Sequence, residues 1–172
     1  MSQAYATVSE ADTYFSERLH STVWDNASVA DQTKALLQAT RDIDCLNFKG
    51  YKATVATLLS GVYDVSLVDP ATIRAAEAAQ ELEFPRGTDT VVPPIIQRAC
   101  FEIAYALLDG VDPDTELENL AVVSQGYAGV RTTYNRIQQP IEHLVAGIAS
   151  ATAWRMLKPF IRDGQAIKTS RV

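Results

Sequence analysis

The chain has 172 residues, of which 47% are hydrophobic, and its formal net charge is −6 at pH 7. This length and composition predict one domain with a core of ordinary size. The sequence contains no apolar run of about 18 residues and no basic segment followed by an apolar block, so we expect neither a membrane partner nor a secretory signal. Cys45 and Cys100 lie at positions expected on apolar helix faces, which favours buried free thiols in a reducing compartment.

The charges are divided unevenly along the chain. Residues 1–130 carry 8 Lys and Arg against 19 Asp and Glu, a net charge of −11, whereas residues 131–172 carry 7 against 2, a net charge of +5. An acidic part and a basic end suggest different partners for the two parts. An ordinary solvated surface explains the same pattern, so both interpretations stay open.

Two amphipathic helices are predicted near the N-terminus. The first is capped by Ser9 and ends near Leu19. Its apolar face is expected to contain Ala11, Tyr14, Phe15 and Leu19. Trp24 is expected in the loop that follows. The second helix begins at Ser28 and ends at the sequence FKGY, residues 48–51. Its apolar positions are Leu36, Ala39, Thr40, Ile43 and Leu46.

The middle of the chain contains one ambiguous segment and two clear helical patterns. Residues 53–69 are rich in Val, Leu and Tyr, which favours short strands or an ordered loop. Residues 70–82 are rich in Ala and predict a helix of about three turns. A helix that opens at Pro93-Pro94 and stops at Gly110 is the predicted centre of the core. Its apolar stripe consists of Ile96, Ala99, Cys100, Ile103, Ala104, Leu107 and Leu108.

The last third of the chain changes from a helical to a strand-like pattern and back. β-Branched and aromatic residues around two glycines predict a β-hairpin or extended arm at about 120–135. A last helical stretch follows Pro140, and Pro159 ends or kinks it. The predicted fold is therefore mainly α: a small helical bundle of four to six helices with that arm. Residues 1–160 are expected to form the domain and 161–172 a flexible tail.

We identify no catalytic, cofactor-binding or metal-binding residues in the sequence, and we expect neither an enzyme nor a cofactor. His20 and His143 are 123 positions apart and lack ligand partners at metal-site spacing. Cys100 lies inside an apolar stripe, so a role in the core is favoured over that of a nucleophile. Glu81 and Glu83 form a possible carboxylate pair for glycoside hydrolysis, but acidic residues beside a loop usually face solvent.

Nucleic-acid binding is an open alternative. Basic residues and one aromatic residue are interleaved near the C-terminus, a combination that holds single strands through phosphate contacts and base stacking. They are Arg131, Tyr134, Arg136, Arg155, Lys158, Arg162, Lys168 and Arg171. The basic residues are spread over 41 positions without a cluster of four. Because the acidic part of the chain repels a polyanion, we expect only weak binding to single-stranded DNA.

Four segments in order resemble one known family. They are YATVSEADTYFSERLHSTVW, ALLQATRDIDCLNFKGYK, QELEFPRG and IIQRACFEIAYALLDG. Across residues 4–160 the chain resembles the head–tail connector (adaptor, or head-completion) proteins of tailed bacteriophages. That group includes sequences labelled DnaT-like single-stranded-DNA-binding proteins. The chain departs from the family at residues 53–79, which are longer than the usual link.

The resemblance implies a virion structural protein in the neck, between capsid portal and tail, assembled in the host cytoplasm. It implies a ring of typically twelve copies that docks on the portal protein, receives tail-completion proteins and lets double-stranded DNA pass without tight binding. Phe84, Pro85 and Arg86 would anchor the loop before the central helix and orient it in the ring. A single-stranded-DNA-binding replication accessory protein is the alternative function.

The basic C-terminal end is the expected partner-binding segment. We expect residues from about Lys158 onward to be poorly packed in the free subunit, because few apolar residues follow Pro159. The residues expected to contact the portal or a neighbouring subunit are Arg162, Ile167, Lys168 and Arg171.

Overall fold

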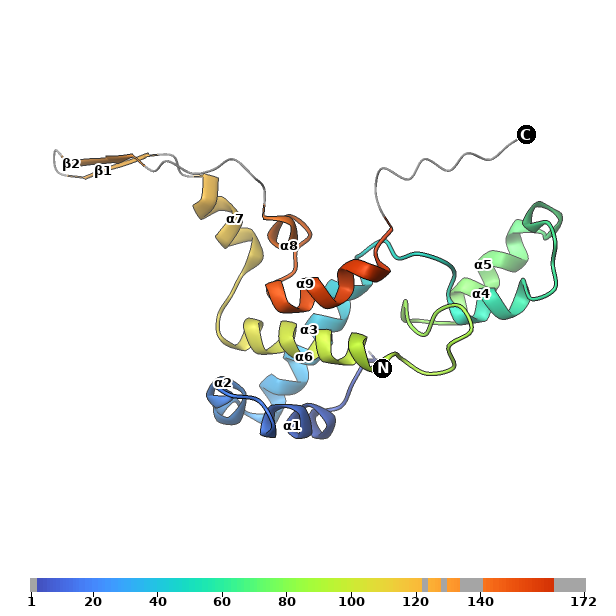
Figure 1. Cartoon of the computed structure of the whole chain (residues 1–172), viewed down its shortest axis with the longest axis horizontal. Helices are drawn as coiled ribbons and strands as arrows, with labels where there is room; N and C mark the ends of the chain where they lie inside the picture. The colour runs from blue at the N-terminus through green and yellow to red at the C-terminus, as the bar shows by residue number, and fades with distance from the viewer. Residues whose placement is uncertain (1–2, 122–123, 128–129, 134–140, 163–172) are drawn as a thin grey trace.

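The computed structural model describes residues 3–121, 124–127, 130–133 and 141–162. It confirms the mainly α fold (Figure 1). The described residues form nine α-helices, more than the four to six that the sequence predicts. The count was too low because the helices at 22–26, 53–58 and 113–121 were not predicted and the last helical stretch divides into 142–145 and 151–157.

The elements follow one another along the chain with short connections. The α-helices are α1 (Val8–Ser16), α2 (Thr22–Asn26), α3 (Val29–Asp44), α4 (Ala53–Leu58), α5 (Pro70–Ala78), α6 (Pro94–Leu108), α7 (Pro113–Ala121), α8 (Glu142–Val145) and α9 (Ala151–Leu157). Two 3-10 helices are η1 (Val65–Leu67) and η2 (Lys158–Phe160). The strands are β1 (Ser124–Tyr127) and β2 (Val130–Thr133), which pair antiparallel.

Helix α6 lies at the centre of the core, as the sequence predicts. It packs against α3 and α9, and α1 covers part of the same core (Figure 1). Ile96, Cys100 and Ile103 are fully buried, whereas Leu107 is half-buried. At the end of α6, the Gly110 amide bonds to the Leu107 carbonyl at 3.1 Å, with φ of +86° at the glycine, so Gly110 terminates the helix as predicted. We call α1, α2, α3, α6 and α9 the body.

The N-terminal region differs from the prediction in three details. Thr7, not Ser9, caps α1, and the Glu10 carboxylate accepts a bond from the Thr7 amide at 2.7 Å. Because α1 ends at Ser16, Leu19 leaves the apolar face and is 83% exposed. Trp24 lies in α2, not in a loop, and stacks on Phe15 with ring centroids 4.8 Å apart. The Trp24 indole is buried because it stacks on Phe15, and this tertiary contact cannot be predicted from the residues around Trp24 in the sequence.

Residues 53–78 form a helical hairpin rather than strands or a loop. Helices α4 and α5 pack on each other, and this pair, here called the α4–α5 hairpin, projects to one side of the body (Figure 1). Within α4 the Val55 side chain is fully buried, and the Thr57 hydroxyl donates back to the Ala53 carbonyl at 2.8 Å. The predicted helix at 70–82 is present as α5, but it ends at Ala78 rather than near residue 82.

One helix and one cysteine also differ from the sequence analysis. Helix α7 was not predicted. The Asp112 side chain accepts a bond from the Asp114 amide at 3.1 Å, and Pro113 occupies the first turn. Cys100 is buried, but Cys45 is exposed at the end of α3. Cys45 lies two positions after the buried Ile43, so the helical spacing places its side chain on the opposite side of α3 from the apolar face on which we expected it.

Candidate functional site

The junction between the body and the α4–α5 hairpin contains the Phe84-Pro85-Arg86 sequence. Phe84 is buried, and its ring makes edge contacts with Tyr5, Phe48 and Phe160 at centroid distances of 6.0, 4.7 and 5.9 Å. The Phe84–Pro85 peptide bond is cis. Three segments that are far apart in the sequence therefore meet on one aromatic ring.

Arg86 ties this loop to the segment after α3. Its guanidinium forms an ion pair with the Glu83 carboxylate. Its Nε donates to the Lys49 carbonyl at 3.0 Å and its Nη2 to the Gly50 carbonyl at 2.7 Å. Lys52 pairs with the other Glu83 oxygen at 3.3 Å. The sequence analysis assigned Arg86 to the anchor of this loop, but it gave no sign of these carbonyl partners.

A second polar group closes the junction on the body side. The Tyr5 hydroxyl donates to Asp44 and accepts a bond from the Phe84 amide at 3.3 Å. The Asp44 carboxylate also accepts from the Glu83 amide at 3.3 Å. Burial raises the pKa of Asp44, although the bond from Tyr5 opposes that shift. These contacts hold three segments of the chain together at the junction.

The C-terminal end is packed further than the sequence predicts. The Lys49 amide donates to the Phe160 carbonyl and the Arg162 amide donates to the Asn47 carbonyl, both at 2.8 Å. The expectation that the chain is poorly packed from Lys158 onward is therefore wrong for 158–162, because Phe160 packs against Phe84. Of the predicted partner-binding residues, Arg162 is exposed. The others, Ile167, Lys168 and Arg171, lie outside the described residues.

The groups weighed for catalysis are in unreactive surroundings. Burial raises the pKa of the Cys100 thiol to about 12, and the thiol lies 3.6 Å from the Thr40 hydroxyl. Glu83, half of the possible carboxylate pair, is neutralised by two cations. Burial lowers the pKa of His143. Within the described part of the chain, no group of three His, Cys, Asp or Glu side chains is placed to hold a metal ion.

Sequence reasoning missed a partly buried ion pair between α6 and the turn after α1. Glu102 is only 5% exposed and pairs with Arg18 at 3.1 Å, while the Tyr14 hydroxyl donates to it at 2.7 Å. The Arg18 guanidinium lies over the Tyr105 ring at 4.3 Å. Burial and this bond raise the pKa of Tyr14 to about 12. The signal available in the sequence was a glutamate inside the apolar stripe of α6.

Only some of the basic residues considered for nucleic-acid binding lie within the described residues. The Lys158 ammonium pairs with Glu142 at 2.6 Å, and the Arg155 guanidinium donates to the Ala151 carbonyl at 3.2 Å. The side chains of the other residues in that set, apart from Arg162, lie outside the described residues. The described part therefore supplies three of the eight side chains, and one of these already has an acidic partner.

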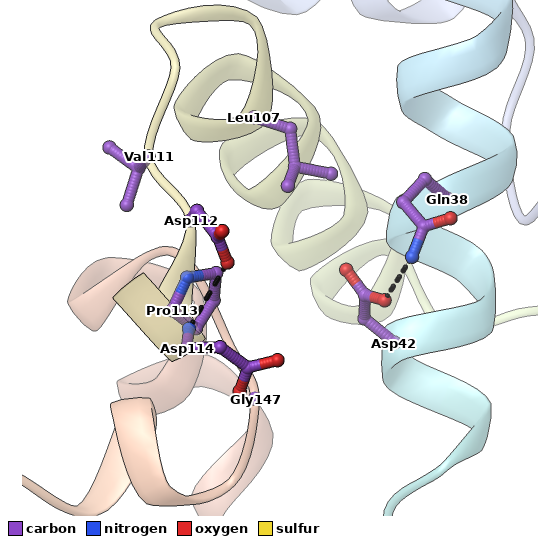
Figure 2. A pocket seen from close by; sticks show the side chains of 8 residues that line it. All are labelled: Gln38, Asp42, Leu107, Val111, Asp112, Pro113, Asp114 and Gly147. Atoms are coloured by element: carbon purple, nitrogen blue, oxygen red, sulfur yellow. Dashed lines mark hydrogen bonds between the residues drawn. The ribbon is translucent and has the colours of Figure 1, made fainter. Parts of the chain in front are cut away.

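Two surfaces remain as candidates for binding. The first is the α4–α5 hairpin, where Tyr63 is fully exposed, Leu67 is 83% exposed and α5 has no buried residue. The second is a groove of about 310 Å³ (Figure 2). Its lining comes from α3, the end of α6, the start of α7 and the turn after α8. The lining residues are Gln38, Asp42, Leu107, Val111, Asp112, Pro113, Asp114 and Gly147.

Comparisons with family models, with curated proteins and with solved structures gave no match. In the described part of the chain, no helix is both long and apolar enough to span a membrane.

Proposed function

We propose that this chain is a subunit of the head–tail connector of a tailed bacteriophage. In this function, copies of the chain form a ring in the virion neck that docks on the portal protein and receives tail-completion proteins. The ring surrounds the channel through which double-stranded DNA passes. The ordered resemblance of residues 4–160 to that family motivates the proposal.

The observation that carries the proposal is the exposed apolar surface of the α4–α5 hairpin. Tyr63 and Leu67 lie at the tip of the hairpin, and Val65 lies between them with 39% of its surface exposed. Three exposed apolar residues within five positions of a projecting element favour a surface that another molecule covers. A neighbouring copy in a ring would cover it. This hairpin is also the segment that is longer than the usual link in the resembling family.

The charge of the chain supports a channel through which DNA slides. Residues 1–130 carry a net charge of −11, and phosphate affinity comes from Lys and Arg. A ring of acidic subunits therefore gives the DNA few places to bind. Lys158, one of the basic residues of the C-terminal part, is already paired with Glu142 in the free subunit.

The direct test is to mix the purified chain with the portal protein of the same phage and image the product by negative-stain electron microscopy. We expect a closed ring attached to one face of the portal. A chain that stays monomeric and unattached at all concentrations would contradict the proposal.

A parallel measurement addresses the alternative, a single-stranded-DNA-binding accessory protein. Fluorescence anisotropy with a labelled oligonucleotide at physiological salt should detect only weak binding. A complex with a Kd of about 1 µM or tighter, whose affinity fell steeply with salt, would favour the DNA-binding function instead.

A further inference from the structure

The groove beside the end of α6 combines an apolar wall with an acidic rim. Leu107, Val111 and Pro113 form the wall, and Asp42 and Asp114 face the same space from opposite sides (Figure 2). A volume of about 310 Å³ is at the lower end for ligand pockets, which suits one or two side chains of a peptide.

The geometry of the rim is fixed by local hydrogen bonds. The Gln38 amide donates to Asp42 at 2.7 Å, and Asp112 accepts from the Thr115 hydroxyl at 2.8 Å. Among the ion pairs of the described residues, none involves Asp42, Asp112 or Asp114. Asp42 and Asp112 are thus oriented before any ligand arrives, and a cation that bound there would displace none of the salt bridges among the described residues.

The charge around the groove is one-sided. Residues 99–130 contain no Lys or Arg, and residues 109–118 contain five acidic residues. Arg41 is the neighbouring cation on α3 that lowers the pKa of Asp42, against the larger effect of burial, which raises it. A ligand that fits must offer positive charge to the rim and an aliphatic side chain to the wall.

The end of this chain has that composition. Residues 163–172 read DGQAIKTSRV, with Lys168 beside Ile167 and Arg171 beside Val172. Both cations therefore have an aliphatic neighbour, as the wall and rim require. We propose that the groove binds residues 163–172 of a second copy of the chain. This inference rests on the proposed ring, in which a contact between two different surfaces repeats from each copy to the next.

The first experiment measures binding of a labelled peptide of residues 163–172, blocked at both ends. The receptor is the full chain with Lys168→Glu and Arg171→Glu, so that its own segment does not compete. We expect saturable binding with a Kd of about 100 µM or tighter, which weakens as salt is added. A peptide with the same two Glu substitutions should not bind. Equal binding of both peptides would overturn the proposal.

Variants of the groove test its location. Asp42→Asn with Asp114→Asn, added to the same receptor, should weaken peptide binding at least tenfold without lowering the melting temperature. The matched control is Glu81→Gln with Asp89→Asn, which removes the same charge from an exposed segment outside the groove. If both double variants lost the same peptide affinity, only the overall charge of the chain would matter, and the assignment of the binding site to the groove would be wrong.

A charge exchange tests whether the contact joins two copies. One chain carries Asp42→Lys and Asp114→Lys, and the other carries Lys168→Glu and Arg171→Glu. Sedimentation velocity should show that each alone associates less than the wild type, and that the mixture recovers association. A mixture that stays dissociated would exclude a contact between two copies. The groove would then bind residues 163–172 of its own chain, which contradicts the proposal. Peptide binding without portal attachment would contradict the connector function alone, and portal attachment without peptide binding would contradict this inference alone.

Discussion

The body and the α4–α5 hairpin use their apolar residues in opposite ways. In the body, Ile43, Ile96 and Ile103 are completely buried at the contacts between α3 and α6. In the hairpin, Val55 is buried, but Tyr63 and Leu67 face solvent. Since burial of apolar area stabilises a fold, the body should determine folding and the hairpin should contribute little to it. The fold itself does not use the exposed hydrophobic residues of the hairpin, and these are the residues that the connector proposal assigns to assembly.

The largest predicted effect is the difference in unfolding free energy between one substitution in the body and one in the hairpin. Ile103→Asp buries a carboxylate without a partner and should cost more than about 4 kcal/mol of unfolding free energy. Leu67→Asp places the same group in solvent and should change it by less than about 0.5 kcal/mol. Urea unfolding followed by circular dichroism measures both. Full stability of Ile103→Asp would show that α6 is not the centre of the core.

The second prediction locates the end of the body. Deleting 160–172 removes Phe160 from Phe84 and both backbone bonds to 47–49, so it should cost about 2–4 kcal/mol. Deleting 163–172 leaves those contacts intact and should leave the melting temperature unchanged. Equal melting temperatures for the two truncated chains would mean that Phe160 does not contribute to the core.

The third prediction concerns the junction between the two regions. Arg86→Ala leaves Glu83 and two backbone carbonyls without their guanidinium donor. The substitution should lower the unfolding free energy by about 1–3 kcal/mol. It should also speed proteolysis within the α4–α5 hairpin, because that hairpin is attached to the body here. Arg74→Ala, on the exposed surface of α5, is the control. If both variants were cut at the wild-type rate, Arg86 would not fix the hairpin.

The smallest predicted effect compares a helix cap in each region. The amide and hydroxyl of Thr7 lower the pKa of Glu10, and the hydroxyl and amide of Ser66 lower that of Asp64. A lowered pKa in the folded state adds stability above the unfolded pKa, and this stability is lost as the pH falls through the folded value. Glu10→Gln should therefore lose less than about 1 kcal/mol of unfolding free energy at pH 7 and a smaller amount at pH 3.

Asp64→Asn should not change global stability at either pH, because η1 lies outside the body. Thermal unfolding at both pH values provides the readout. A pH-dependent loss in Asp64→Asn as large as that in Glu10→Gln would show that the hairpin unfolds together with the body.

The elements that depend on local chemistry could be predicted from the sequence. The stripe of α6, its stop at Gly110 and the cap of α3 at Ser28 were predicted and are present. These features follow from spacing, from a left-handed backbone position and from a hydroxyl beside a free amide. Short segments were missed, because α4 is only six residues long and its Val and Thr residues favour strands locally.

The candidate sites depend on residues that only the fold brings together. Arg86 bonds to carbonyls almost forty positions away, and the groove joins α3 to the end of α6 and to Gly147. No pattern of nearby residues encodes such contacts. The exposed tip of the hairpin was missed for a related reason, because composition gives the hydrophobicity of Tyr63 and Leu67 but not their exposure.

The most direct test of the connector proposal is assembly on the portal by a variant of the hairpin tip. Tyr63→Ser with Leu67→Asp removes exposed apolar groups that make no contribution to the core. Electron microscopy of the portal mixed with this variant, beside the wild type, measures ring attachment, and a thermal melt checks the fold. We predict a wild-type melting temperature and loss of the attached ring. Normal ring formation by the variant would contradict the assignment of this surface to assembly.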